Sequence, residues 1–381
     1  MLLGLVGGSG SSSAGGGKTL GEGLAAAGAA AGGGEGGGDL PSSLRRLIQA
    51  TRNRALSKGK LGLGGTSAYT PALQPLATTW EIVRDGHIDF IISEIKPEAL
   101  KHKKASQALA SSSPPSSLPS SSSSSSPKDP FGAGQREAFL TVCDVGEGHI
   151  LMLNKYPTMT DHLILVTKEW QPQQGLLRAE DLYAWHRLIH DVPAVGIFNS
   201  GPEAGASQGH RHLQAIPLDI LRSYRPSLLP SPHPSHIVPI NALIEPHLAS
   251  LPPSSSTSSF HVPTLPFRHR LFLLPPSPTP HELEGLYHRL LKRIGVLAQG
   301  GGQEGGREGG RGLGDEDVQK AYNLVMTEKW LMAVPRSEGR YVGVDVNGMG
   351  FLGCLLSKDK ETTGVIKRVR PFNVLKGVVA A

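Results

Sequence analysis

Cysteine is the scarcest residue in this sequence: Cys143 and Cys354 are the two that occur among 381 residues. They form no C-x-x-C pair, so neither a cysteine zinc site nor a disulfide framework is indicated. Aromatic residues make up 5% of the chain. No apolar run approaches the roughly 18 residues that a membrane-spanning helix needs. The sequence therefore predicts neither a disulfide scaffold nor a transmembrane protein, and a reduced intracellular compartment fits the two thiols.

Glycine, proline and serine are present in excess, with 48 Gly and 30 Pro. Four stretches consist almost entirely of small and polar residues: 7–38, 111–127, 252–259 and 300–314. Such stretches bury too little apolar surface to offset the entropy lost when they become ordered. We therefore expect a disordered leader over residues 1–40 and disordered inserts at 111–127 and 300–314.

Charge and the amino-terminal segment limit the partner and the compartment. Lys and Arg exceed Asp and Glu by 38 − 32 = 6, and the isoelectric point is near 9.3. This balance suits an anionic partner such as a nucleotide, although a basic surface without such a role is the alternative. The leader has no secretory pattern, and Lys18 is its one basic residue. We expect a cytoplasmic protein, with a plastid or other organelle as the alternative if the leader is a transit peptide.

Hydrophobic periodicity predicts a mixed α+β chain. Helical spacing of apolar residues is found in 41–56, 178–191 and 280–299. Alternation around Asp85-Gly86 predicts a hairpin over 78–95. Further strands are predicted in 149–157, 161–170, 195–199, 210–218, 321–336 and 340–358. "LILVTKEW" (163–170) resembles "NLVMTEKW" (323–330), which hints at a duplicated αβ unit.

The stretch "GASQGHRHLQ" (205–214) places two histidines and a glutamine on alternate positions. On a strand, the side chains of His210, His212 and Gln214 point the same way, and that of Arg211 points the opposite way. The preceding loop, "NSGPEAGAS" (199–207), contains mostly small residues, whose backbone N–H groups can approach an anion closely. The pattern thus indicates two imidazoles and an amide beside a cradle of phosphate size.

Three interpretations of the two histidines compete. In the first, they are zinc ligands, although the third residue on that face, Gln214, is a poor zinc ligand. In the second, they are hydrogen-bonded core histidines without a chemical role. In the third, one of them is a nucleophile, since imidazole with a pKa near ~6.5 is largely neutral at pH 7. The glycine-containing loop and Gln214 favour the third interpretation.

The sequence resembles a known family at this point. "GASQGHRHLQAIPL" is similar to the H-x-H-x-Q signature of the nucleotidyltransferase branch of the histidine-triad superfamily. The chain more closely resembles the ATP adenylyltransferases, also called diadenosine tetraphosphate phosphorylases. The stretches that carry the resemblance are 153–173, 198–218, 321–336 and 346–359. The resemblance implies an α+β fold of two fused histidine-triad units with an antiparallel sheet and flanking helices. We place an N-terminal unit with the catalytic motif at 41–250 and a C-terminal unit at 251–381.

The resemblance also implies roles for individual residues. His212 is the nucleophile, His210 orients it or contacts phosphate, and Gln214 contacts the phosphate groups. Positions that match the family's substrate contacts are Asn154, Lys155, Asn199, Gly205, Ala206, Ser207, Gln208, Asn323, Thr327 and Lys329. Lys103 matches a family lysine close to the polyserine insert. No cofactor and no protein-bound metal are implied, beyond Mg²⁺ that accompanies the nucleotide.

The implied activity is reversible phosphorolysis of diadenosine tetraphosphate to ATP and ADP through a covalent adenylyl-histidine. The expected partners are these nucleotides and inorganic phosphate, with no nucleic acid and no membrane, and the expected state is a monomer. Three alternatives stay open: a dinucleoside polyphosphate hydrolase, an enzyme like the hexose-1-phosphate uridylyltransferases, and a non-catalytic nucleotide-binding regulator. The uridylyltransferases often place Pro where Arg211 stands and carry a cysteine-containing metal site, which argues for an adenosine polyphosphate here.

Overall fold

The computed structural model describes residues 40–60, 77–95, 129–223, 237–252, 258–298, 318 and 320–380. Residues 1–39, both predicted inserts and Lys103 lie outside these ranges. The expectations for them therefore stay predictions.

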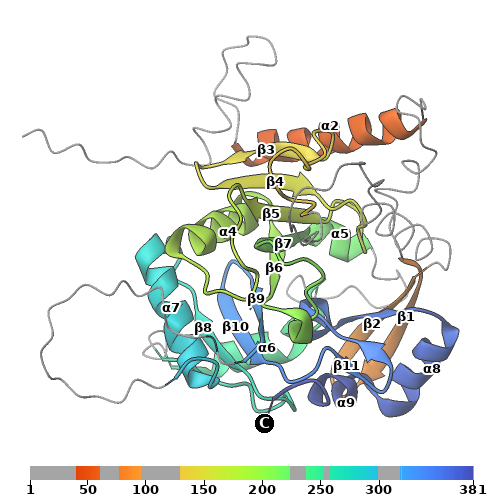
Figure 1. The fold of residues 1–381 in the computed structure, drawn as a ribbon. Helices are drawn as coiled ribbons and strands as arrows, with labels where there is room; N and C mark the ends of the chain where they lie inside the picture. Colours follow the sequence, from red (N-terminus) through yellow and green to blue (C-terminus); the bar gives the residue numbers. More distant parts are fainter. Residues whose placement is uncertain are drawn as a thin grey trace, which may run out of the picture.

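An eight-stranded antiparallel sheet forms the centre of the molecule (Figure 1). Neighbouring strands are hydrogen-bonded in an order that differs from the chain order, and the last three come from the C-terminal part of the chain. Across the sheet the strands are β3 (Thr141–Val145), β4 (His149–Leu153), β5 (Leu163–Thr167), β7 (His212–Pro217), β6 (Ala194–Asn199), β9 (Tyr322–Met326), β10 (Trp330–Pro335) and β8 (Arg270–Leu273).

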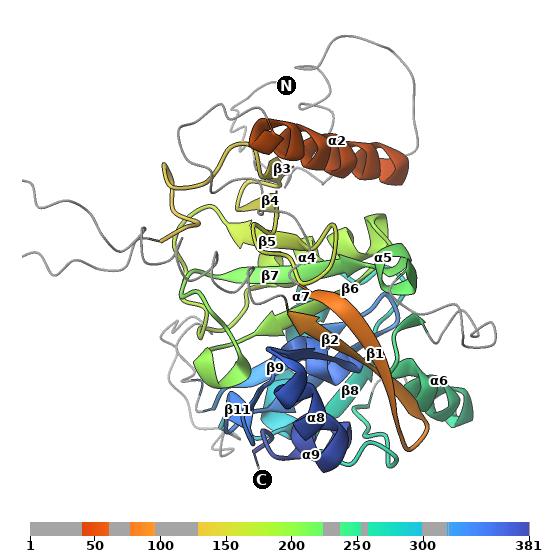
Figure 2. The ribbon, with the colours of Figure 1, turned by 90° about the vertical axis from the view of Figure 1, so that its right-hand side faces the viewer.

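Two separate hydrophobic cores cover the two faces of this sheet. The consecutive residues Ile197 and Phe198 belong to different cores, as the alternation of side chains along a strand requires. The core around Phe198 includes apolar residues of α4 (Ala179–Asp191) and α7 (Pro280–Arg293). A capping box of Thr279 and Glu282 begins α7. Helix α2 (Leu40–Lys60) also contributes to this core and runs beside β3 (Figure 2).

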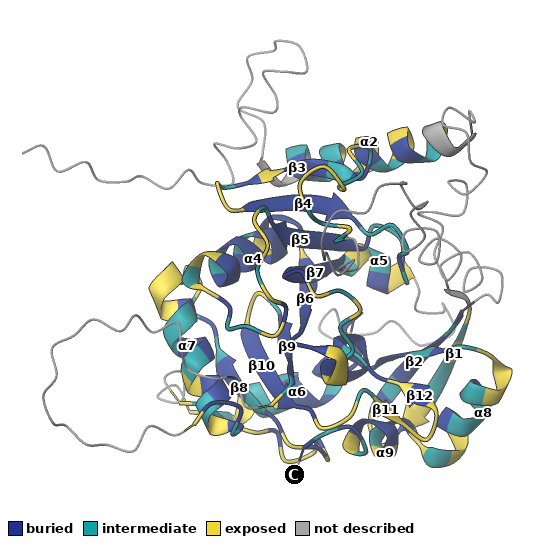
Figure 3. Cartoon of the chain, in the orientation of Figure 1, coloured by how far each residue is buried: buried dark blue, intermediate teal, exposed yellow. Residues whose placement is uncertain are grey.

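A three-stranded sheet contributes residues to the other core. It consists of β1 (Ala77–Asp85), β2 (Ile88–Ile95) and β13 (Cys354–Ser357), with β13 parallel to β2. The C-terminal part of the chain thereby pairs with the first hairpin. The remaining elements are η1 (Pro202–Ala204), α5 (Leu218–Ser223), α6 (Asn241–Ser250), β11 (Arg340–Tyr341), β12 (Val344–Asp345), η5 (Gly348–Leu352), α8 (Lys360–Val369) and α9 (Pro371–Lys376). Figure 3 shows buried residues concentrated in the strands and exposed ones on the outer faces of the helices.

The predicted α+β class with an antiparallel sheet and flanking helices is confirmed. The predicted hairpin forms with its turn at Gly86, which has φ +58°. The two similar stretches lie on β5 and β9 of one sheet. That sheet takes strands from both 41–250 and 251–381, and the boundary between these units stays a prediction. Within the described residues, no helix is long and apolar enough to cross a membrane.

One strand begins later than the sequence predicts. β7 starts at His212, whereas His210 forms a single isolated bridge with Pro172. Proline lacks the N–H group that a continued ladder needs. His210 therefore lies in the short connection before the strand.

Candidate active site

His212 is the first residue of β7, in the middle of the large sheet. Its side chain is buried, and its ring Nδ1 lies 2.8 Å from the backbone O of His210. A carbonyl oxygen can only accept, so Nδ1 carries the proton and Nε2 carries the lone pair. Within the part of the chain that the structure describes, Nε2 has no hydrogen-bond partner. Burial lowers the pKa of His212 to about 4, which keeps the ring neutral at pH 7.

This environment makes a prediction about pH. We expect the rate of labelling of His212 by diadenosine tetraphosphate to change little between about pH 8 and pH 5.5, because burial lowers the pKa of this ring to about 4. An ordinary imidazole would titrate near ~6.5, inside this range. Protonation removes the Nε2 lone pair only as the pH falls through the lowered pKa of about 4. The measurement is single-turnover labelling at each pH, with circular dichroism to confirm that the fold is intact. The substrate has no terminal phosphate, so its own charge is constant in this range. A rate that halves near pH 6.5 would contradict the assignment.

A buried glutamine holds the backbone at His212. The side-chain oxygen of Gln173 accepts from the His212 N–H group at 2.8 Å. Its amide nitrogen donates to the backbone oxygen of Asn199 at 2.7 Å and to that of His212 at 3.2 Å. Gln173 thus joins the start of β7 to the end of β6 and fixes the position of the imidazole between them.

The ring of His210 contacts protein groups at both nitrogens. Nδ1 lies 2.6 Å from Oδ2 of Asp129, and Nε2 lies 2.9 Å from the backbone O of Thr167. The ring of Phe131 lies 5.3 Å from the ring of His212, measured between centroids. Since His210 supplies the carbonyl that fixes the tautomer of His212, this arrangement favours an orienting role for His210.

Removing the partner of His210 tests that role. We expect Asp129→Asn to slow labelling of His212 by roughly tenfold or more, because hydrogen bonds to charged groups contribute about 1.5–3 kcal/mol. His210→Asn should be more damaging but leave some labelling. Asp144→Asn is the matched control, since this carboxylate on β3 is 61% exposed and pairs with Lys168. Equal labelling rates in Asp129→Asn and the control would show that Asp129 has no part in orienting the site.

Arg211 points to the opposite face of the sheet, as the alternation predicts. Its Nη1 lies 2.8 Å from Oδ2 of Asp181 on α4, and Oδ1 of Asp181 lies 2.8 Å from Nε2 of His149. Burial would raise the pKa of Asp181, but the hydrogen bond from His149 and the charge of Arg211 outweigh it, and the pKa is lowered. The buried contacts of Asp181 with Arg211 and His149 join α4 to β4 and to the residue directly before β7.

Gln214 lies on the same face as His212 and faces a third histidine. Its Oε1 is 2.8 Å from Nε2 of His162. Burial lowers the pKa of His162 to about 4, so this ring is neutral and donates from Nε2. The carbonyl end of the Gln214 amide is thereby directed at His162, and its NH₂ end is directed away from that ring. Gln214 can donate to a ligand beside His212.

The first substrate-contacting pair of the prediction lies near this histidine. The backbone N–H of Asn154 donates to the backbone O of His162 at 2.8 Å. The side-chain oxygen of Asn154 accepts from the backbone N–H of Tyr156 at 2.9 Å. Lys155 forms a half-buried ion pair with Glu137. The structure thus brings Asn154 to the neighbourhood of Gln214, with Lys155 next along the chain.

The loop from Gly205 to Gln208 is a tight turn that leads to His210. Gly205 has φ +86°, and a Cβ atom there would lie 2.7 Å from Cβ of Asn347, so glycine is required. The amides of Gly205 and Ala206 close the turn onto Pro202 and Gly201, at 2.9 Å each. Among the described residues, no acceptor is found for the amides of Ser207 and Gln208. Of the predicted cradle, these two N–H groups remain for an anion.

Asn199 and Asn323 lie together in the interior beneath this loop. Oδ1 of Asn199 accepts from Nδ2 of Asn323 at 2.7 Å and from the backbone N–H of Gly348 at 2.9 Å. Nδ2 of Asn323 also donates to the backbone O of Ala204 at 2.9 Å. Both amides are thus bonded to protein groups that support the loop. Their predicted contact with substrate stays a prediction.

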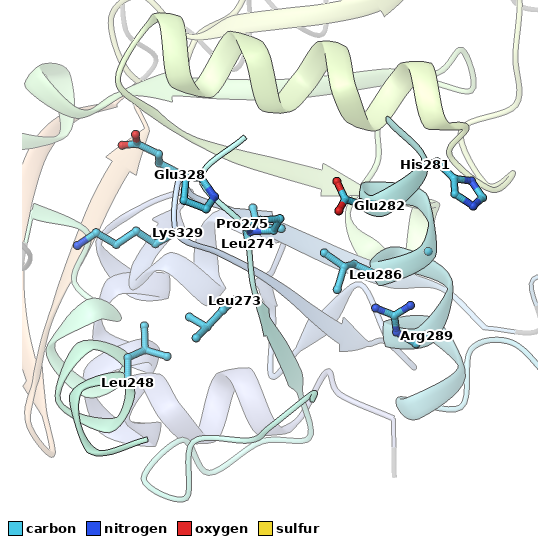
Figure 4. Close-up of a pocket in the computed structure, with 12 residues that line it drawn as sticks. Leu248, Leu273, Leu274, Pro275, His281, Glu282, Leu286, Arg289, Glu328 and Lys329 are labelled. Atoms are coloured by element: carbon cyan, nitrogen blue, oxygen red, sulfur yellow. The ribbon is translucent and has the colours of Figure 1, made fainter. Parts of the chain in front are cut away.

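Thr327 and Lys329 are not brought together with His212. Both lie in the turn between β9 and β10, where Oγ1 of Thr327 accepts from the N–H of Trp330 at 3.1 Å. Asn323 pairs with Asn199 at the loop end of the strands, so this turn is at the other end of the sheet. Lys329 lines a groove of about 1000 Å³ between α6, β8 and α7 (Figure 4). The predicted roles of these two residues in the same site as His212 therefore have no geometric support.

Sequence reasoning missed several residues that build the site: Asp129, His162, Gln173, Asp181 and Arg336. His162, Gln173 and Arg336 carried a signal, because they lie within the stretches 153–173 and 321–336 that resemble the family. Asp129 and Asp181 lie outside these stretches, and nothing in the sequence indicates which residues they contact.

Comparison with known proteins agrees with this geometry. Residues 43–231 match the family model described as Ap4A phosphorylase N-terminal domain, and residues 263–381 match the ATP adenylyltransferase C-terminal domain. The two models together span both parts of the large sheet. The chain belongs to the ATP adenylyltransferase family, also called Ap4A phosphorylases, where Ap4A is diadenosine tetraphosphate.

Two proteins of Saccharomyces cerevisiae are among the relatives. Diadenosine 5',5'''-P1,P4-tetraphosphate phosphorylase 2 is 26% identical over 252 residues, 61% of this chain and 70% of the relative. Protein APA1 is 26% identical over 251 residues, with the same shares. The crystal structure of yeast Ap4A phosphorylase Apa2 is similar in fold, with a TM-score of 0.59 and 20% identity over 87% of this chain and 94% of that chain. A structure of Apa2 in complex with Ap4A gives a TM-score of 0.57 and 19% identity over 88% and 97%.

Proposed function

We propose that this protein is an Ap4A phosphorylase, which converts Ap4A and inorganic phosphate to ATP and ADP, reversibly. The observation that carries the proposal is the fixed tautomer of His212. Its Nδ1 proton is bound to the carbonyl of His210, so the Nε2 lone pair is available in a neutral, buried ring. Family membership supports the same activity, because a relative is named for Ap4A phosphorolysis.

In the first step, Nε2 of His212 attacks the α-phosphorus of bound Ap4A. The nitrogen–phosphorus bond forms as the bond to the bridging oxygen breaks, and ATP leaves as an anion that needs little protonation. The adenylylated ring carries a positive charge, and the hydrogen bond from Nδ1 to the His210 carbonyl stabilises it. Lys155 offsets part of the polyphosphate charge.

In the second step, an oxygen of inorganic phosphate attacks the same phosphorus. The nitrogen–phosphorus bond breaks, ADP forms, and His212 returns to the neutral state. In both steps charge develops on the non-bridging oxygens. The N–H groups of Ser207 and Gln208 and the NH₂ group of Gln214 are the donors that stabilise it.

We further propose that the enzyme acts as a monomer on nucleotides and phosphate, without a nucleic acid or membrane partner. Neutral His212 needs no protein-bound metal for the attack, and Mg²⁺ enters with the nucleotide. The cytoplasm is the proposed compartment, because residues 1–40 contain fewer basic residues than a typical transit peptide. A plastid or other organelle is the alternative.

The deciding experiment is cleavage of Ap4A with and without inorganic phosphate, run beside a UDP-sugar. We expect ATP and ADP in equal amounts, only when phosphate is present, and no comparable cleavage of the UDP-sugar. Formation of ATP and AMP without phosphate would indicate a hydrolase. Binding of Ap4A with no turnover in either condition would indicate a regulator.

A further inference from the structure

Arg336, directly after β10, is a buried arginine whose hydrogen bonds all go to neutral groups. Its side chain is 2% exposed. Nη1 donates to Oδ1 of Asn323 at 2.5 Å and, more distantly, to the backbone O of Ala204 at 3.5 Å. The other donors reach the backbone oxygens of Val378 at 3.1 Å, Glu338 at 2.7 Å and Val346 at 2.9 Å.

No negative charge balances this guanidinium within the described residues: none of the Asp and Glu side chains there forms an ion pair with it. Burial alone lowers the pKa of Arg336 to about 9, so the group is still a cation at pH 7. Buried arginines are usually paired, because an uncompensated charge inside a protein is costly. Within the described residues the cation is stabilised by carbonyl oxygens and by the ring of Phe351, whose centroid lies 5.5 Å from Cζ, but by no anion. The fold therefore keeps a buried cation at a cost in stability that a nearby anion would offset.

The position of the guanidinium indicates what balances it. Ala204 is the last residue of η1, and the loop that follows it carries the free amides of Ser207 and Gln208. Arg336 and Asn323 both donate to the Ala204 carbonyl from beneath. The cation is thus separated from the proposed phosphate cradle by one turn of backbone.

A polar chain connects the same guanidinium to the nucleophile. It bonds to Asn323, Asn323 bonds to Asn199, and the backbone oxygen of Asn199 accepts from Gln173. Gln173 in turn holds both backbone polar groups of His212. Arg336 therefore sits at the far end of a continuous set of buried hydrogen bonds that supports β6, β7 and the loop.

We propose that Arg336 is the buried counter-charge for the polyphosphate, a binding determinant that acts through the loop without touching the substrate. This inference rests on the proposed function, which places the polyphosphate on the loop. A residue that only clamped the backbone would affect ligands of every charge alike. A buried counter-charge affects them in proportion to their charge.

The expected size follows from Coulomb's law. Two unit charges about 10 Å apart at an effective dielectric constant near 20 change an affinity by roughly tenfold. More distant phosphates contribute less, so a loss of about threefold per added phosphate group is expected. Exposed cations are screened by salt, whereas a buried one is screened much less.

The test compares binding of adenosine, AMP, ADP and ATP by isothermal titration calorimetry. The proteins are the full chain, Arg336→Gln, Arg336→Lys and the control Arg84→Gln. Arg84 lies on β1, is 70% exposed and pairs with Asp89, so its replacement changes net charge equally. We expect Arg336→Gln to bind adenosine normally and to lose affinity progressively, by about threefold for AMP and about thirtyfold for ATP. In Arg336→Lys and in the control, affinity should depend on the number of phosphates as it does in the wild-type protein.

Other results would overturn the inference. An equal loss for adenosine and ATP in Arg336→Gln would show a clamp and no counter-charge, and unchanged ATP affinity would remove Arg336 from binding altogether. If Arg336→Gln does not fold, as judged by thermal melting, Arg336→Lys decides. This variant removes the planar guanidinium with its hydrogen-bond geometry, and it keeps the charge when binding is measured at about pH 6, where a buried lysine stays protonated. A retained dependence of affinity on ligand charge then supports the proposal, and an equal loss for all ligands contradicts it. Failure of the proposed function looks different, because the wild-type chain itself would then bind no nucleotide or fail to phosphorolyse Ap4A.

Discussion

His212→Asn is expected to abolish Ap4A phosphorolysis and all labelling of the protein by substrate carrying label at the α-phosphorus. Loss of a nucleophile typically lowers turnover by at least about 10⁴-fold. Asparagine suits this position because its amide can still donate to the His210 carbonyl, as Nδ1 of the imidazole does at 2.8 Å. The site therefore loses the Nε2 lone pair and keeps its hydrogen bond. The thermal midpoint should change little.

The control for this variant is His281→Asn on α7, a histidine whose side chain is 93% exposed. It should retain full turnover and full labelling. The assays are single-turnover labelling with the isotope, followed by product analysis with phosphate present. Near-normal phosphorolysis by His212→Asn would end the assignment of the nucleophile, and labelling without turnover would move the covalent step to another residue.

The motif at 205–214 shows what a local pattern can and cannot predict. Alternation on a strand correctly placed His212 and Gln214 on one face and Arg211 on the other. It placed the start of the strand too early, because the bridge between His210 and Pro172 is isolated and β7 begins two residues later. Periodicity describes an element once it exists, and the partner strand decides where that element begins.

Partners of the motif were beyond the reach of sequence reasoning. Asp129 is 81 residues from His210, and His162 is 52 residues from Gln214. Such pairs form because β5 lies beside β7 and because the segment before β3 reaches the start of β7, and neither fact has a local signature. The same holds for Asn199 and Asn323, which are 124 residues apart and bond to each other. A single sequence can indicate that both are polar and well placed, but it cannot indicate that they pair.

A lowered pKa does not by itself mark His212. Burial lowers the pKa of His162, His212 and His269 to about 4 in each case. A buried Nδ1–H group that donates to a carbonyl two residues earlier recurs at His269, whose Nδ1 lies 2.7 Å from the O of Phe267. There, however, Nε2 accepts from the N–H of Val262 at 3.0 Å. What distinguishes His212 is therefore the unoccupied Nε2, since the tautomer and the low pKa are common to both.

Gln214→His is expected to change the product of the enzyme from ADP to AMP. The adenylyl-histidine on His212 must be released by an acceptor, and water is a weak nucleophile at pH 7 unless a group takes its proton. Glutamine cannot take it, because an amide does not exchange a proton at neutral pH. His162 cannot take it at Nε2 either, because that nitrogen donates to Gln214 at 2.8 Å. Inorganic phosphate already carries anionic oxygens and needs no base.

A histidine at position 214 would supply the missing base directly beside the intermediate. We expect the phosphate-independent release of AMP to rise by about 10²-fold, the lower range of general base catalysis, and phosphate-dependent turnover to fall. Gln214→Asn is the matched control: it keeps an amide at this position and adds no base, so turnover falls and AMP does not appear. The measurement is the ratio of AMP to ADP from Ap4A with and without phosphate. Unchanged AMP release by Gln214→His, no higher than that of Gln214→Asn, would show that water is excluded by the shape of the site, and the protective role assigned to the amide would be wrong.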